Sequence, residues 1–587
     1  MAVENLITEH IDIWTSAVKT KSTSGRGSSN KLELYGVKKL RELILELAVR
    51  GKLVPQDPND EPASVLLERI AQEKAQLVKE KKIKKPRKYE PIDDNSLPFN
   101  IPSSWKWARI EDLGHDLGQK KPDKTFTYVD VGSINKELGY IDEPSILEHS
   151  EAPSRARKLV QKNTVIYSTV RPYLLNIAVI DRDFNPEPIA STAFAIIHPL
   201  SGISSSYIYR YLRSPSFIEY VESVQTGIAY PAINDKQFFF GLIPVPPSAE
   251  QHRIVAKVDE LMALCDQLEQ QTEASIEAHQ VLVTTLLDTL TNSADADELM
   301  QNWARISEHF DTLFTTEESI DQLKQTILQL AVMGKLVPQD PNDEPASELL
   351  KRIAEEKAQL VKEKKIKKQK ALPPISEDEK PFELPSGWEW CHLNSLISEM
   401  DAGWSPACPP EASPNHETWG VLKTTAVQSM EYREYENKVL SPSKEPRPQY
   451  EVKNGDILIT RAGPKNRVGV SCLVQTTRPK LMISDKIIRF HLIELGMSNN
   501  FVSLCLNAGA TSEYLESSKS GMAESQMNIS QDKLKMAPIP LPPIREQTLI
   551  VKKVEELIDL CHKLKLSLEK GKHAHLQFTD SVIEQAV

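Results

Sequence analysis

The sequence predicts an α+β protein in which two mixed α/β domains are joined by long antiparallel coiled-coil helices, with a pseudo-twofold internal repeat. Three observations predict this class: a block that occurs twice, an apolar stripe of coiled-coil type that also occurs twice, and two intervening segments built of short β-prone runs. Internal repetition of this kind constrains the architecture of a whole chain.

The repeated block reads LAVRGKLVPQDPNDEPASVLLERIAQEKAQLVKEKKIKK in its first copy, which begins at Leu47, and it returns at Leu330. Of its 39 positions, 35 are identical in the two copies. In each copy a helix ends at a glycine, Gly51 or Gly334, and a second helix opens with acids and a proline and closes with lysines. So faithful a copy predicts two equivalent frames.

A helical stripe follows each segment that lies between the repeats. Its apolar residues alternate three and four positions apart, as in a coiled-coil seam. The two seams are Ile254, Val258, Leu261, Cys265 and Leu268, and Ile550, Val554, Leu557, Cys561 and Leu564. We expect the two seams to pair mainly with each other in an antiparallel arrangement, with His279 and His575 at seam or boundary positions.

The segments between the frames alternate β-prone runs with turns that contain proline and glycine, as compact mixed α/β domains do. The two segments hardly resemble each other. The predicted parts are a helical region with the first repeat (1–96), a first head (97–247), a central helical region with the second repeat (248–379), a second head (380–543) and a C-terminal coiled-coil helix (544–587). Near the N-terminus, an amphipathic pattern predicts a short helix, and TKSTSGRGSSN predicts a linker.

Composition excludes several classes of protein. No apolar run is long enough to span a membrane and no signal pattern opens the chain, so we expect a cytoplasmic protein. The six cysteines form no CxxC pair, which favours buried, reduced thiols over a zinc site or disulfides. A P-loop, a dinucleotide or methyl-donor glycine turn, HEXXH, GxSxG and an amino-methylating NPPY-type motif are all absent from the sequence, so we do not expect catalysis by this chain.

Charge is distributed unevenly, although the net charge is −11. Residues 152–180 contain five basic residues and no acid, and residues 457–484 also contain five basic residues and no acid. One basic run alone is usually a solvated face. A similar run at a similar place in both heads favours phosphate binding.

Several local motifs together resemble the specificity subunit of type I restriction-modification systems. They are APSRAR at Ala152–Arg157, YSTVRPYLLN at Tyr167–Asn176, NGDILITRAGPKNRVG at Asn454–Gly469, and the tails PVPPSAEQHRIV and PLPPIREQTLIV. The resemblance covers nearly the whole chain. The first head departs from the pattern, because it has NTVIYS where the second has GDILIT.

The resemblance implies target-recognition heads that read a bipartite, asymmetric site in double-stranded DNA, one half-site each. It implies two modification subunits, which carry S-adenosylmethionine and methylate adenine, and restriction subunits, which use ATP and Mg²⁺ for translocation and cleavage. No cofactor is expected on this chain itself. Arginine and lysine neutralise phosphates, and arginine and amide side chains read base edges. The candidate DNA-binding residues are Arg155, Arg157, Lys158, Arg171, Tyr173 and Asn176 in the first head, and Trp404, Arg461, Lys465, Asn466 and Arg467 in the second.

Two alternatives remain open. One is a non-catalytic assembly scaffold with coiled coils and protein-binding heads. The other is a nuclease or methyltransferase whose motifs are not recognised. Divergent heads on matching frames favour the DNA-reading hypothesis, since a single protein partner would favour matching heads.

Overall fold

The computed structural model describes residues 7–20, 32–87, 89–93, 97–227, 229–294, 296–369 and 372–587. The chain forms two compact units, which are Met1–Ser275 with Gly571–Val587, and Ile276–Lys570. The predicted N-terminal helix is present as α2 (Ile11–Ser16), whereas residues 21–30 of the predicted linker lie outside the described residues.

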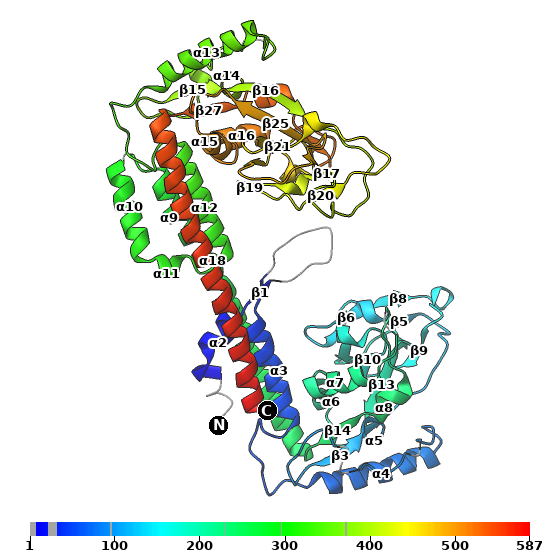
Figure 1. The fold of residues 1–587 in the computed structure, drawn as a ribbon. Helices are drawn as coiled ribbons and strands as arrows, with labels where there is room; N and C mark the ends of the chain where they lie inside the picture. Colours follow the sequence, from blue (N-terminus) through cyan, green and yellow to red (C-terminus); the bar gives the residue numbers. More distant parts are fainter. Residues whose placement is uncertain are drawn as a thin grey trace. The chain divides into compact units, whose positions relative to one another are not determined.

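The first unit contains a helical frame and the first head (Figure 1). Its helices are α2, α3 (Tyr35–Val49), α4 (Ala63–Lys79), α5 (Ile110–Leu113), α6 (Ser205–Leu212), α7 (Pro215–Val224), α8 (Asp235–Phe240), most of α9 (Ser248–Thr291) and the end of α18 (Ile544–Ala586). Its strands are β1 (Lys19–Thr20), β2 (Leu32–Glu33), β3 (Lys106–Arg109), β4 (Gly114–His115), β5 (Phe126–Val129), β6 (Ile134–Asn135), β7 (Tyr140–Ile141), β8 (Ser145–Leu147), β9 (Ala156–Leu159), β10 (Val165–Ser168), β11 (Ile177–Val179), β12 (Pro188–Ser191), β13 (Phe194–Pro199) and β14 (Leu242–Val245).

The second unit repeats this plan with the second head. Its helices are the end of α9, α10 (Ala296–Glu308), α11 (Phe310–Leu313), α12 (Glu317–Val332), α13 (Ala346–Lys362), α14 (Leu393–Leu396), α15 (Asn499–Cys505), α16 (Gly509–Ser517), α17 (Gln531–Lys535) and most of α18. Its strands are β15 (Glu389–His392), β16 (Ile397–Ala402), β17 (Gly420–Leu422), β18 (Val427–Gln428), β19 (Glu431–Tyr432), β20 (Asn437–Val439), β21 (Ile457–Thr460), β22 (Ala462–Gly463), β23 (Ser471–Leu473), β24 (Leu481–Met482), β25 (Ile487–Leu492), β26 (Met527–Asn528) and β27 (Pro538–Leu541).

The two heads share one topology although their sequences differ. The first head has a sheet of order β11-β10-β13-β4, and the second has the corresponding order β23-β21-β25-β16. A second sheet, β8-β5-β12-β9, corresponds to β20-β17-β24, and each contains one parallel pair, β5 with β12 or β17 with β24. The structure therefore confirms two mixed α/β domains and shows that they are versions of one fold.

Each head is closed by pairing its first strand with its last. β3 pairs antiparallel with β14, and β15 pairs antiparallel with β27. The prolines of the IPVPP and IPLPP segments are tolerated because these sheets have only two strands, so a missing N–H breaks no central ladder. The long helices α9 and α18 begin directly after these closing strands.

In the second unit, α12 lies between the two long helices. Thr284 of α9 contacts Gln322, and Lys335 donates to the carbonyl of Thr291, so α9 runs parallel to α12. Lys565 of α18 lies 3.5 Å from Asp321, whereas Ile550 packs in the core that contains Val332. Since α18 therefore runs against α12, the two long helices are antiparallel here, as predicted.

The first unit has the same arrangement around α3. Arg41 of α3 pairs with Asp266 and Glu269 of α9, and Tyr35 donates to Asp580 of α18 at 2.8 Å. The seam residues Ile254, Val258, Leu261 and Cys265 are buried. Each seam thus packs on a helix of the repeated frame and on the end of the other long helix. The frame helix is a partner that the apolar pattern of the seams alone did not reveal.

Glycines end α3 and α12, as predicted. Gly51 and Gly334 have φ values of +70° and +72°, which favour glycine. A Cβ atom at Gly51 would lie 2.4 Å from Pro102, and one at Gly334 would lie 2.5 Å from Pro385. These turns therefore fix how each frame passes into its head.

Candidate nucleic-acid interface

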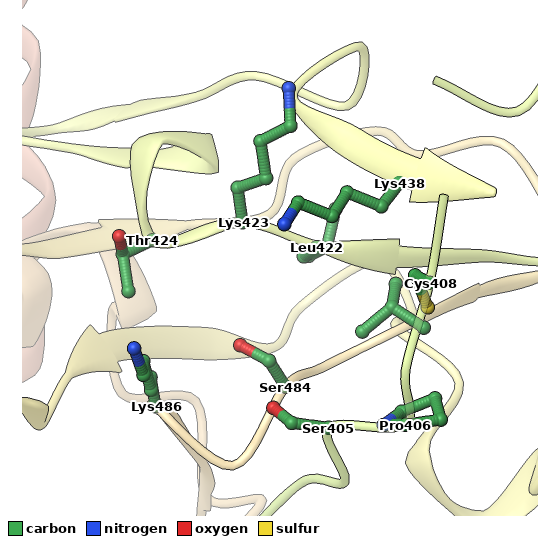
Figure 2. Close-up of a pocket in the computed structure, with 10 residues that line it drawn as sticks. Ser405, Pro406, Cys408, Leu422, Lys423, Thr424, Lys438, Ser484 and Lys486 are labelled. Carbon is green, nitrogen blue, oxygen red and sulfur yellow. The ribbon is translucent and has the colours of Figure 1, made fainter. Parts of the chain in front are cut away.

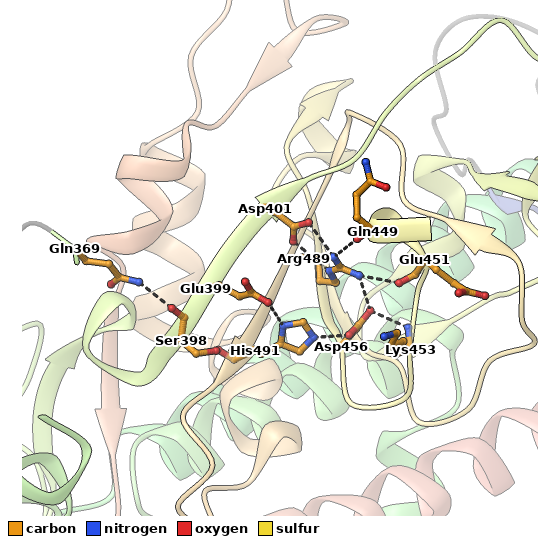
Figure 3. A network of polar contacts seen from close by, with 10 residues as sticks. All are labelled: Gln369, Ser398, Glu399, Asp401, Gln449, Glu451, Lys453, Asp456, Arg489 and His491. Atoms are coloured by element: carbon orange, nitrogen blue, oxygen red, sulfur yellow. Dashed lines mark hydrogen bonds and ion pairs between the residues drawn. The ribbon is translucent and has the colours of Figure 1, made fainter. Parts of the chain in front are cut away.

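A buried polar contact, which we call the latch, supports the corresponding corner of both heads, and Figure 3 shows the latch of the second head. In the second head, Asp456 is buried, accepts from the backbone of Lys453 at 2.9 Å and lies 2.6 Å from His491. In the first head, Thr164 takes the place of Asp456. It accepts from the backbone of Gln161 at 3.1 Å, and its hydroxyl lies 3.1 Å from the ring of His198.

The turn before each latch also matches. Asn163 has φ +69° and Gly455 has φ +91°, and their backbone N–H groups donate to Ile180 and Val474 at 2.7 and 2.8 Å. Asparagine is among the few residues besides glycine that adopt this conformation readily. NTVIYS in the first head is therefore the structural counterpart of GDILIT in the second.

In the first head, the loop after β10 presents a mixed apolar and basic surface. Arg171 is exposed, adopts φ +51°, and stacks its guanidinium 5.0 Å from the ring centre of Tyr230. Tyr173 is 54% exposed and Tyr230 is 68% exposed, and Val170 and Leu174 of the same loop as Arg171 are exposed too. Exposed aromatic rings with an arginine are suited to contact sugars and base edges.

Arg155 and Arg157 lie at the start of β9. Arg155 is exposed and Arg157 is half-buried. Arg157 lines a hollow that also contains Lys121 and His149. Asn176, at the end of the Arg171 loop, is half-buried and its carbonyl accepts from the backbone of Ser168 at 3.0 Å.

Lys158 has a different environment from its neighbours. Its ammonium is buried, donates to the carbonyl of Phe194 at 2.7 Å and lies 3.1 Å from Asp235. Since both contacts are internal, this geometry fits a role in holding β9 against the head rather than the direct DNA contact that the sequence predicted.

The corresponding loop of the second head follows β21. Its β22 strand pairs with β26, and Lys465 and Asn466 are exposed at its tip. Lys465 lies 3.6 Å from Glu524, in an ion pair whose members are both exposed, so the pair is easily exchanged for a phosphate. Arg461 is half-buried at the base of the loop, and its backbone N–H donates to Lys486 at 2.8 Å.

Arg467 is used inside the protein. Its guanidinium donates to the carbonyls of Thr424 and Val427, both at 2.7 Å, and to Gln428 at 2.9 Å. Burial, followed by the charge of Arg433, lowers the pKa of Arg467. As with Lys158, the geometry fits a positioning role.

Trp404 is half-buried and carries Arg447 over its ring at 4.1 Å. Sequence reasoning did not single out Arg447 or Tyr230, because each lies far along the chain from the residue it stacks on. The pairing of an arginine with an aromatic ring is common to both heads, although the residues come from different segments.

Each head is fastened to its long helix by the same set of residues. Trp105 and Gln56 donate to Glu250 at 3.0 and 2.6 Å, and Trp388 and Gln339 donate to Glu546 at 3.0 and 3.1 Å. The neighbouring glutamines act alike: Gln251 accepts from the backbone of Ser204, and Gln547 accepts from that of Ser498. The repeated Trp and Glu-Gln motifs are thus explained as the junction of frame and head.

Within the described residues, no helix is long and apolar enough to cross a membrane. No group of three or more His, Cys, Asp or Glu side chains that could hold a metal ion occurs in that part of the chain.

A duplicated frame that carries two unlike heads of one fold defines a class of protein, and sequence comparison identifies it. The pattern of the family described as "Type I restriction modification DNA specificity domain" matches residues 102–278 and 427–570. These ranges cover more than half of the chain, so the protein belongs to this family of specificity subunits.

Particular relatives agree with this assignment. The chain is 54% identical to the Type I restriction enzyme EcoEI specificity subunit of Escherichia coli and 42% identical to the EcoAI specificity subunit of the same species, and each alignment covers all of both chains. A solved structure described as concerning complex assembly and conformational transition of the type I R-M system matches at 21% identity with a TM-score of 0.50. That match covers 83% of this chain and 99% of the other, and it supports the fold alone.

Proposed function

We propose that this chain is the non-catalytic DNA-reading subunit of a type I restriction-modification complex in the cytoplasm. Each head, at 97–247 and 380–543, reads one half of a bipartite, asymmetric site in double-stranded DNA. The two repeated blocks hold two modification subunits, which supply S-adenosylmethionine and adenine methylation. Restriction subunits supply the ATP- and Mg²⁺-dependent steps.

One observation carries this proposal. The frames are nearly identical, and the heads keep one topology while their exposed loops differ. The loop after β10 offers Arg171 and Tyr173, whereas the loop after β21 offers Lys465 and Asn466. Identical frames suit identical protein partners, and loops that differ on a common fold suit two different half-sites.

The predicted residues divide into two groups under this proposal. Those with exposed or half-exposed side chains contact DNA: Arg155, Arg157, Arg171, Tyr173, Asn176, Trp404, Arg461, Lys465 and Asn466. Lys158 and Arg467 shape the surface from within.

The test is selection from a random duplex pool by the chain assembled with its modification subunit. We expect a bipartite consensus with a fixed gap. Arg157→Ala is expected to weaken binding and to reduce the slope of log affinity against log salt by about one unit, since one phosphate contact is lost. Arg182→Ala, on the same head outside the basic run, is the matched control. Absence of any sequence preference in the wild-type complex would favour the scaffold alternative.

A further inference from the structure

A basic pocket lies in the second head beside the sheet formed by β17, β20 and β24 (Figure 2). Its volume is about 300 Å³. It is lined by Ser405, Pro406, Cys408, Val421, Leu422, Lys423, Thr424, Lys438, Ser484 and Lys486. Three of these side chains are cationic and none is acidic, so the pocket is a concentrated positive site in a chain of negative net charge.

Two acids near the pocket pair with residues that line it, and one of them neutralises Lys423. Glu436 lies 3.4 Å from Lys423 and accepts from Thr425 at 2.7 Å, and Asp485 accepts from Ser405. Lys438 and Lys486 are exposed, and within the described residues their ammonium groups form no hydrogen bond or ion pair. Figure 2 shows the Lys438 ammonium extending over Leu422 and the Lys486 ammonium extending toward Thr424.

The chemistry of the pocket fits a phosphodiester. Ammonium groups pair with phosphate oxygens, and the hydroxyls of Thr424 and Ser484 are additional donors. Ammonium groups without an acid partner, as those of Lys438 and Lys486 are among the described residues, repel each other, and an anion removes this repulsion. The hollow of the first head, by contrast, has the acid Asp123 among its lining residues, together with Lys121 and Arg157.

The corresponding positions of the first head carry no lysine. The matching strand registers pair Val421 with Lys438 in the second head and Tyr128 with Ser145 in the first. Lys423 follows β17 as Asp130 follows β5, and Lys486 precedes β25 as Ala193 precedes β13. An acid, a hydroxyl and a methyl group thus replace the three ammonium groups.

The pocket adjoins the loop that presents Lys465 and Asn466. The carbonyl of Lys486 accepts from the backbone N–H of Arg461, at the base of that loop, at 2.8 Å. A phosphate held in the pocket would therefore fix the position of the loop along the duplex.

We propose that Lys438 and Lys486 hold one backbone phosphodiester of the target duplex, in a contact that belongs to the second head alone. This inference rests on the proposed function and adds to it an asymmetric anchor. The anchor positions the second head without reading bases, since phosphate contacts carry no sequence information directly.

The first experiment compares Lys438→Gln/Lys486→Gln with wild type in the full chain assembled with its modification subunit. We expect roughly fivefold weaker binding, a salt slope lower by about one unit and an unchanged consensus sequence. Lys444→Ala, an exposed lysine of the same head outside the pocket, should bind as wild type does. Lys438→Arg/Lys486→Arg should restore affinity, because charge is retained.

The second experiment locates the phosphate with duplexes that carry single neutral methylphosphonate linkages. One linkage in the half-site of the second head should weaken wild-type binding but leave the double-Gln variant unaffected. If that variant binds like Lys444→Ala and every linkage affects both proteins equally, the inference is overturned while the proposed function stands. If the wild-type complex selects no DNA sequence, the proposed function itself fails. Stabilisation of wild type by inorganic phosphate, with DNA affinity unaffected in the variant, would assign the pocket to a free anion and overturn the inference.

Discussion

At the scale of single residues, Lys74 and Lys357 occupy the same position in the two copies of the repeated block, but the charges around them differ. Lys74 donates to the carbonyls of Glu111 and Gly114, and Lys357 donates to the carbonyl of Asn394. Burial lowers the pKa of Lys74, and the charges of Asp112 and Glu111 oppose that effect.

Lys357 has no acid in the corresponding places, which are Asn394 and Ser395. Burial, together with the charge of Lys535, lowers its pKa to about 8. The folded state therefore releases this proton near pH 8, whereas the unfolded chain holds it to about pH 10.4.

We predict that stability depends on pH through Lys357. Below about pH 8 both states are protonated and the cost of burying the charge is fully present. From there to about pH 10.4 the unfolded state binds more protons, so the free energy of unfolding rises with pH relative to Lys357→Met. The rise should be roughly 1–2 kcal/mol, discounted for partial exposure. Denaturant unfolding of wild type and Lys357→Met at pH 7.5 and 9.5 measures this rise. The corresponding rise relative to Lys74→Met should be smaller. A wild-type minus variant difference that is constant with pH would contradict the prediction.

The distribution of charged residues in the sequence identified basic segments, but it did not show which of their side chains are bound inside the protein. Lys158 and Arg467 belong to acid-free runs, yet their partners are mostly backbone carbonyls, of Phe194 for one and of Thr424 and Val427 for the other. Every residue carries a carbonyl, so composition gives no signal for such pairing. The fold alone decides which carbonyls are left to accept.

At the scale of elements, the junction of frame and head is the most closely repeated feature. Glu546 opens α18 and accepts from Trp388 and Gln339, which enter from the segments on either side of α13. Burial raises the pKa of Glu546, which shows that the carboxylate is kept at some cost. It is retained because two buried donors need an acceptor.

We predict that Glu546→Ala destabilises the second unit by roughly 1–3 kcal/mol, because the Trp388 indole and the Gln339 amide lose their acceptor. Glu546→Gln keeps one acceptor oxygen and should cost less. Glu555→Ala, an exposed position on the same helix, is the control and should leave stability unchanged within about 0.5 kcal/mol. Thermal and denaturant unfolding provide the measurement. Equal stability of Glu546→Ala and the control would show that the junction does not depend on this acceptor.

The sequence predicted the frames well because apolar periodicity, helix caps and a near-identical repeat are local signals. It did not show that the heads share a fold. Thr164 replaces Asp456 and Asn163 replaces Gly455, so the same latch and turn are built from residues with little formal similarity. These residues are equivalent because they form the same hydrogen bonds, and a comparison of the sequences alone does not show hydrogen bonds.

At the scale of the whole molecule, the two halves exchange helix ends. The first unit includes residues 571–587, which contain the end of α18, and the second begins at Ile276 within α9. In the second unit Val283, Leu287 and Leu290 pack in the core around α12. In the first unit Thr579 and Val582 are buried beside α3. Each half thus completes its frame with a helix end from the other half.

This exchange predicts the behaviour of a fragment that ends at Asn292. The fragment loses residues 571–587, and its own residues 276–291 expose the apolar side chains of Val283, Leu287 and Leu290. Because the two helix ends occupy corresponding places on α3 and α12, the end from a second copy can replace the missing one. A symmetric homodimer with an isologous interface should form.

Under the proposed function, such a homodimer with its modification subunit should methylate a palindromic split site, made of the first half-site and its inverted complement. Native mass spectrometry measures the oligomeric state. Sequencing of methylated adenines identifies the site in cells that carry the modification subunit and, in place of the full chain, the fragment. Val283→Asp/Leu287→Asp in the fragment is the matched variant and should abolish both dimer and methylation, because two charges would enter the shared core. A strictly monomeric soluble fragment would contradict the exchange of helix ends. A dimer that methylates no palindromic site would instead contradict the assignment of one half-site to each head.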